Sequence, residues 1–292
     1  MLTAVRLFTD SFALFPLISL LKKRNIMRNF LWEIRNVDFD FIRVGIIKRS
    51  KRGIKTCILS IILLMLSFGF MMRGEGLHGQ VFIEISVFCG NISTMGAMTV
   101  VQESLREITD RMFTVNIVTK NAAIRLPLTY KDLRKLDALA NISSKLRRAA
   151  TTLKGVLSAH MFFGSATLFL RFLVMAYLTT RLIGYGIDPK MLLHLAREYF
   201  MVVYIIATMV FPCCQATKAS HQIYEKLYEM CIDDETETLV QNERLKLHLY
   251  TRGQVEFSAY GVFKLDLPLL HGIAAAVASY VVILLQLQQQ KP

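Results

Sequence analysis

Long apolar stretches that alternate with charged ones dominate the hydrophobic pattern of this chain. A helix of about 20 mainly apolar residues crosses the ~30 Å hydrocarbon core of a bilayer. Three stretches approach this length with almost no charge, and three further ones are interrupted by a few polar or charged residues. In chain order the six candidate spans are residues 1–21, 56–72, 85–102, 155–180, 199–217 and 267–287. The pattern predicts an all-α fold, a polytopic membrane helix bundle with six visible spans.

The basic residues decide the predicted orientation of these spans. Residues 22–55 hold 11 Lys and Arg, residues 103–154 hold 11 and residues 218–266 hold 6, whereas residues 73–79 hold one and residues 181–190 hold two. Cytoplasmic loops are the ones that retain Lys and Arg. The three basic stretches are therefore expected inside the cell, which places the C-terminus, and the short N-terminus before the first span, outside it.

Two of the basic stretches also carry apolar residues at helical spacing. Within residues 132–154, apolar residues recur every three or four positions among Lys and Arg, and residues 215–250 show a similar alternation. We expect both stretches to form long helical cytoplasmic extensions of the bundle, through which subunits assemble. The alternative is a pair of solvated amphipathic helices at the membrane surface.

Composition narrows the functional classes. Hydrophobic residues make up 53% of the chain and charged residues only 20%, below the ~25% usual in soluble domains. The net charge of +13 would indicate a nucleic-acid partner in a soluble protein, but its clustering beside the spans indicates membrane lipids and no nucleic acid. Because no CxxC pair, P-loop or nucleophile motif occurs, we predict no catalytic residue, metal site or cofactor, and we do not expect an enzyme.

Polar residues at membrane depth are the candidate ligand-binding groups. Arg171 lies inside the span 155–180, where a lipid-facing charge costs ~2.5–3.5 kcal/mol. It either pairs with Glu84, which lies in the same half of the membrane, or snorkels to the surface. Tyr177 and Tyr204 belong to a cluster of tyrosines at the outer ends of two spans, which is either an interfacial aromatic belt or the wall of a ligand pocket. We predict these four residues as ligand-binding.

The end of the chain carries a sequence signature. Ser279 and Tyr280 are followed by five hydrophobic residues and then by Gln286 and Leu287, and about 20 residues upstream the chain reads Phe-Ser-Ala-Tyr-Gly-Val-Phe over residues 257–263. This resembles the C-terminal signature of insect gustatory receptors, which is Thr-Tyr, five hydrophobic residues and Gln-Phe, preceded by Phe-Ser-x-x-Gly-x-Phe. Ser279 and Leu287 are conservative departures, whereas Tyr280 and Gln286 keep their spacing.

This resemblance implies the seven-helix fold of the insect chemoreceptors, with an intracellular N-terminus and an extracellular C-terminus. The six spans would be its second to seventh helices, and the first helix would be absent. The implied function is the detection of small-molecule tastants by a ligand-gated nonselective channel for permeant cations. We expect this channel in the plasma membrane of chemosensory neurons, as a homo- or hetero-tetramer with related receptor subunits.

The same resemblance divides the chain. Residues 1–266 would supply the ligand-binding helices and cytoplasmic loops, and residues 267–292 the pore-lining last helix and a short extracellular tail. The implied pore residues are Ser279, Tyr280, Ile283, Gln286 and Leu287.

Two other classes of membrane protein are alternatives. A G-protein-coupled receptor has seven helices and an outside N-terminus, which disagrees with an even number of spans and an outside C-terminus. A small polytopic transporter is expected to show an internal repeat or broken helices, and no repeat is visible in the sequence.

Overall fold

The computed structural model describes residue 18 and residues 21–46, 78–123, 130–185, 189–234, 239–250 and 255–289. Its helices are α2 (Arg24–Val44), α4 (His78–Ala123), α5 (Tyr130–Tyr185), α6 (Pro189–Ile232), α7 (Glu243–Tyr250) and α8 (Leu267–Gln289), and its strands are β1 (Ser258–Ala259) and β2 (Phe263–Lys264). The predicted all-α class is confirmed. The candidate span 56–72, and all but two residues of 1–21, lie outside the described residues.

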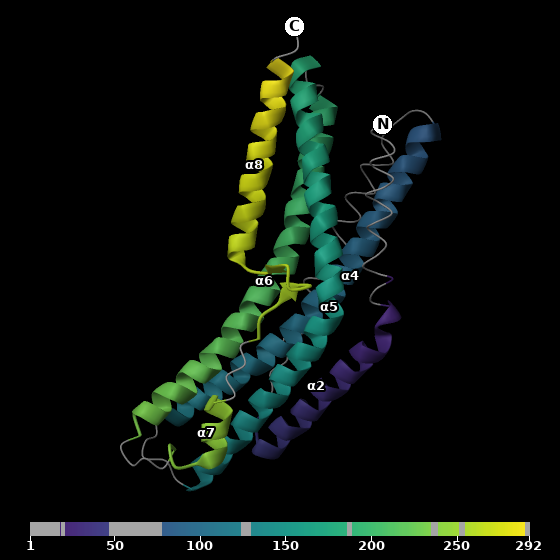
Figure 1. The fold of residues 1–292 in the computed structure, drawn as a ribbon. Coiled ribbons are helices and arrows are strands. Elements are labelled where there is room, and N and C mark those ends of the chain that lie inside the picture. Colours follow the sequence, from purple (N-terminus) through teal and green to yellow (C-terminus); the bar gives the residue numbers. More distant parts are fainter. Residues whose placement is uncertain are drawn as a thin grey trace.

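Three long helices each continue from an apolar stretch into a polar one. The candidate spans 85–102, 155–180 and 199–217 lie inside α4, α5 and α6, and the helix predicted over 132–154 is the first half of α5. In Figure 1, α8 stands beside the upper parts of α5 and α6, while α2 and α7 lie along the lower parts of the long helices. Each of α4, α5 and α6 therefore extends through both the apolar and the polar half of the molecule.

Length and apolar composition single out few of the described helices as membrane-spanning. The α6 segment Tyr199–Ile232 is long and apolar enough to cross a bilayer, and in α5 the segments Asp132–Ala159 and Met161–Tyr177 make a second span if they are taken together. In α8, Leu267–Ile283 is a shorter apolar segment.

α5 is bent, and α6 contains a proline in its interior. The two segments of α5 meet at 40°. Just beyond the bend, the Ser165 hydroxyl donates to the Met161 carbonyl (2.7 Å) and the Phe162 carbonyl (3.0 Å), and such hydroxyl contacts compete with the helical hydrogen bonds and favour bending. In α6, Pro212 has no N–H, so it cannot close the helical hydrogen bond to the carbonyl four residues earlier.

The helix predicted over 215–250 is interrupted in the structure. α6 ends at Ile232 and α7 begins only at Glu243. In the turn between them, the buried Asp234 carboxylate accepts the backbone N–H of Leu239 at 2.7 Å, which satisfies a donor that the helix no longer pairs.

A short hairpin leads into α8. Ser258 pairs with Lys264 and Ala259 with Phe263, and the turn between the strands holds Gly261 at φ 75°, a conformation that glycine adopts without steric cost. α8 then begins next to Asp266, whose carboxylate accepts the Leu269 N–H (3.2 Å) as an N-cap, with Pro268 in the first turn, where no N–H is required.

α2 is held against the polar half of the bundle by apolar and charged contacts together. Its inner face repeats every three or four residues and is fully covered: Phe30, Ile34, Val37 and Phe41 are at most 6% exposed. Two acidic side chains beside this face, Asp38 and Asp40, meet cations of α4 and α5, as burial of charge requires.

The most buried of these cations is Arg111 of α4, whose side chain is 4% exposed. Its guanidinium donates to both oxygens of Asp38 (2.9 and 2.7 Å) and also contacts Glu107, while Lys145 of α5 pairs with Asp40 at 2.5 Å. Burial acts to lower the pKa of Arg111, but the bonds to Asp38 and Glu107 outweigh it and raise the pKa. The guanidinium is therefore a fixed cation that ties α2 to the bundle.

We expect Asp38→Asn to lower the melting temperature of the protein in detergent. The substitution removes the charge that faces the buried guanidinium of Arg111, a loss worth about 1–3 kcal/mol. The matched control is Arg43→Gln on the same helix. The Arg43 side chain is 83% exposed and its ion pair with Asp40 is long, at 3.9 Å, so its loss should have little effect on stability. Equal melting temperatures for the two variants would contradict the role given to Asp38.

Candidate functional site

A small pocket lies between α4 and α6 in the apolar half of the bundle. Its volume is about 10 Å³, so the side chains close it almost completely. Two of its lining side chains are methionines, which are unbranched and adaptable in how they fill a core. The lining residues are Met95, Met98, Thr99 and Gln102 of α4, and Tyr204, Ile205 and Thr208 of α6.

Four polar side chains line this pocket: Thr99, Gln102, Tyr204 and Thr208. The hydroxyls of Thr99 and Thr208 donate to their own helix, to the carbonyls of Met95 (2.8 Å) and Ile205 (2.9 Å). The Gln102 amide and the Tyr204 phenol are the remaining polar side chains of the lining. An apolar wall with a few polar tips is the usual construction of a site for a small organic molecule.

The structure separates the four residues that the sequence predicts as ligand-binding. Tyr204 lines the pocket, whereas Arg171 and Tyr177, both on α5, do not. Arg171 is partly buried and interacts with neighbouring groups. The backbone of Glu84 belongs to α4, but its side chain lies outside the described residues, so its pairing with Arg171 stays a prediction.

The tyrosine cluster includes a contact between two helices. The Tyr199 ring of α6 meets Phe172 of α5 edge to face at 5.3 Å, and its hydroxyl lies 3.2 Å from the Thr179 hydroxyl. This contact joins α5 and α6 near the ends of their apolar stretches.

Sequence reasoning missed Met95, Met98 and Gln102. Their spacing of three and four residues places them on one face of α4. That spacing was available as a signal, but it is also the spacing of an ordinary core face.

α8 is covered on one side only. It packs against α5 and, less extensively, against α6, with Val277 buried at 6% exposure. Ser279, Ile283 and Gln286 project from the opposite side and are exposed. The same exposed side carries Gly272 and Ala275, whose small side chains leave the helix backbone accessible in the first turns of α8.

The predicted pore residues whose side chains are described lie on exposed parts of α8. Tyr280 and Ile283 are each 49% exposed, and the Ser279 hydroxyl donates to the Ala275 carbonyl of its own helix at 2.9 Å. Gln286 is exposed, and the side chain of Leu287 lies outside the described residues.

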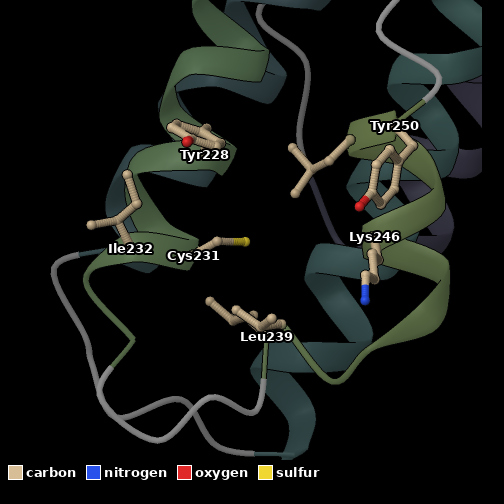
Figure 2. A pocket seen from close by; sticks show the side chains of 8 residues that line it. Tyr228, Cys231, Ile232, Leu239, Lys246 and Tyr250 are labelled. Carbon is tan, nitrogen blue, oxygen red and sulfur yellow. The ribbon is translucent and has the colours of Figure 1, made fainter.

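A second, larger cavity lies at the lower end of the molecule, between the end of α6 and α7. It has a volume of about 480 Å³ and mostly apolar walls, and Figure 2 shows Tyr228, Cys231 and Ile232 of α6 on one side and Lys246 and Tyr250 of α7 on the other. Three of these side chains are largely exposed: Tyr228 at 50%, Ile232 at 66% and Tyr250 at 78%. An apolar surface of this kind is typical of a protein contact.

Two titratable groups near this cavity are shifted by their surroundings. Burial raises the pKa of the Cys231 thiol, and the nearby Asp234 carboxylate raises it further. Burial also lowers the pKa of His248 on α7, where Arg147 opposes protonation and Asp137 favours it. Both groups are therefore neutral near pH 7, which suits an apolar contact surface.

Comparisons with known proteins agree with this geometry. The family model described as 7tm chemosensory receptor matches residues 11–291. Among solved structures, the insect olfactory receptor OR5 from Machilis hrabei is similar at a TM-score of 0.62 and 11% identity, over 98% of this chain and 88% of that chain. The structure of the same receptor in complex with eugenol is similar at a TM-score of 0.67 and 12% identity, over 98% and 81%. No curated protein matches the chain in sequence.

Proposed function

The chain belongs to the 7tm chemosensory receptor family, a family of multi-pass membrane proteins, and from this premise we propose that it is a gustatory receptor that opens a nonselective cation channel when a small tastant binds. The similarity to an insect olfactory receptor supports the helical arrangement that such a channel needs. The C-terminal signature, with Tyr280 and Gln286 at the spacing of gustatory receptors, favours taste over smell. We place the channel in the plasma membrane with its C-terminus outside the cell, because the basic stretches then face the cytoplasm.

The bare side of α8 is the observation that carries this proposal. Within one chain, nothing among the described residues covers Ser279, Ile283 and Gln286. The small residues on the same side let copies of the helix approach closely around an axis. Four such helices would form a channel with a hydrophobic ring at Ile283 and an amide ring at Gln286, and Tyr280 and Leu287 would complete its lining.

The pocket between α4 and α6 is the proposed tastant site. OR5 has been solved in complex with eugenol, a small molecule, which supports a ligand of similar size for this chain. Because the pocket is closed here, a ligand must displace the side chains of Met95 and Met98 to enter between α4 and α6. A ligand that fits the widened pocket would favour the open channel only through a higher affinity for that state.

The lower cavity is the proposed assembly surface. Its exposed aromatic residues, Tyr228 and Tyr250, lie on helices that extend into the cytoplasm in the proposed orientation. Aromatic residues in an apolar patch are the side chains that most often dominate protein interfaces. We propose that related subunits, identical or different, form a tetramer through this surface.

Whole-cell recording in cells without endogenous partners tests the channel. A ligand-evoked current that persists when G-protein signalling is blocked is the expected result, and its loss under that block would favour a G-protein-coupled receptor. Ile283→Ser should raise the leak current, because polarity at a hydrophobic constriction stabilises water inside it. Ala278→Ser is the matched control. Ala278 is also exposed, but it lies about 100° around the helix from Ser279, away from the side that carries Ser279, Ile283 and Gln286.

Replacing the two tyrosines of the lower cavity tests the assembly surface. Tyr228→Ser combined with Tyr250→Ser should shift the protein from tetramers to monomers on native gels, while the protein still inserts into membranes. The control is Trp32→Ser on α2, which removes an aromatic side chain of similar exposure, 66%, away from the cavity. Unchanged tetramers in the double variant would show that subunits meet elsewhere.

A further inference from the structure

A third cavity, which we term the hinge groove, lies between α6 and the chain that leads into α8. Its volume is about 380 Å³. One wall is a face of α6 that runs from Cys214 to Tyr224, and the other is formed by Val255 and the stretch Leu265–Pro268. In Figure 1 the lower end of α8 stands beside the middle of α6, where this groove is found.

The hinge groove lies where two apolar stretches end. The apolar stretch of α6 ends at Thr217, immediately before Lys218, and that of α8 begins at Leu267, immediately after Asp266. Both boundaries therefore fall at the same depth, and in the proposed orientation this depth is the inner surface of the bilayer. Phospholipid headgroups occupy that layer.

The α6 wall of the groove offers hydrogen-bond donors. Thr217, Ser220, His221 and Tyr224 share one face of the helix, at spacings of three and four residues. The Ser220 side chain is only 3% exposed, and its hydroxyl has no hydrogen-bond partner among the described residues. Because no described group takes this hydrogen bond, the hydroxyl is able to donate to a ligand atom in the groove.

Lys218 supplies the positive charge among the lining residues, and it lies on the α6 wall. Lys218 has no ion-pair partner within the described residues. His221 lies 3.3 Å from Glu225. The opposing carboxylate, Asp266, accepts the Leu269 N–H at the start of α8, where the helix dipole stabilises its charge.

The opposite wall is apolar. Val255 and Leu265 are buried, at 5% and 3% exposure, and Leu267, 46% exposed, continues this surface together with Pro268 toward the membrane. Donors on one wall and an apolar surface on the other match a molecule with a phosphate at one end and hydrocarbon at the other.

We propose that the hinge groove binds an anionic phospholipid of the inner leaflet. Its phosphate accepts hydrogen bonds from Lys218, Ser220 and Tyr224, and the beginning of an acyl chain lies along Leu267 and Pro268. Because the groove adjoins the first turn of α8, a bound lipid braces the start of that helix against α6. This site is separate from the tastant pocket, and it rests on the proposed membrane orientation but not on channel activity.

Photo-crosslinking of the full-length chain tests the proposal. The protein is reconstituted into phosphatidylcholine vesicles that contain a photoactivatable phosphatidylserine, and the crosslinked peptides are identified by mass spectrometry. Crosslinks in the α6 segment around Ser220 and in Leu265–Pro268 are expected, and they should fall about fivefold in a variant with Lys218→Gln and Ser220→Ala. Both substitutions are small, and an unchanged elution profile verifies the fold.

Lys226→Gln is the matched control. Lys226 lies on the same helix outside the groove and pairs with Glu229 at 2.5 Å, so its removal should leave the crosslinks unchanged. Equal crosslinking in the groove variant and the control would overturn the proposal. Binding of inorganic phosphate without any lipid crosslink in the wild-type groove would also overturn it, because the site would then take a free anion and not a lipid.

This readout does not depend on channel activity. If the chain forms no channel but the crosslinks appear as expected, the lipid site stands and the proposed function fails. If currents are recorded but the crosslinks are absent or insensitive to the substitutions, the lipid site alone is wrong.

Discussion

The apolar seam between α4, α5 and α6 is the contact on which the other parts of the structure depend. Leu105 and Ile108 of α4, Leu146 and Leu153 of α5, and Ile223 of α6 are all at most 1% exposed, although they lie in the polar half of the chain. The seam continues upward into the apolar half, where Met209 and Val210 of α6 are equally buried. Each of these helices extends through both halves, so one packed core joins the apolar and the polar half of the molecule.

α2 and α8 both pack against this seam, and they differ in how much of their apolar surface the rest of the chain covers. The contact of α2 is nearly complete: its inner apolar face is covered, Asp38 meets Arg111 and Asp40 meets Lys145, while among the described residues the buried Oε2 of Glu33 lacks a hydrogen-bond partner. The contact of α8 is half complete, because only the side with Val277 is covered. The lower cavity with Tyr228 and Tyr250 is likewise open. Open surfaces on α8 and at the lower end of the molecule are consistent with the proposed assembly through both.

The sequence predicts the parts of this structure that depend on local pattern. The helix over residues 132–154 follows from periodicity, and the start of the last helix at residue 267 follows from the beginning of its apolar stretch. The pairing of Arg111 with Asp38 does not, because it joins residues 73 positions apart and no local spacing encodes it. The pocket around Tyr204 was only partly predicted for a related reason: a methionine face looks the same in a sequence whether it lines a pocket or fills a core.

The central claim is that the bare side of α8 faces water inside an assembled channel. The most direct test introduces single cysteines at Ile283, Gln286 and Val277 into the receptor, and measures their modification by a charged, membrane-impermeant thiol reagent against the unsubstituted chain. The account predicts modification at 283 and 286, faster in the presence of an activating ligand, and none at 277. Absence of modification at 283 and 286 in an active channel, or equal modification at all three positions, would contradict it.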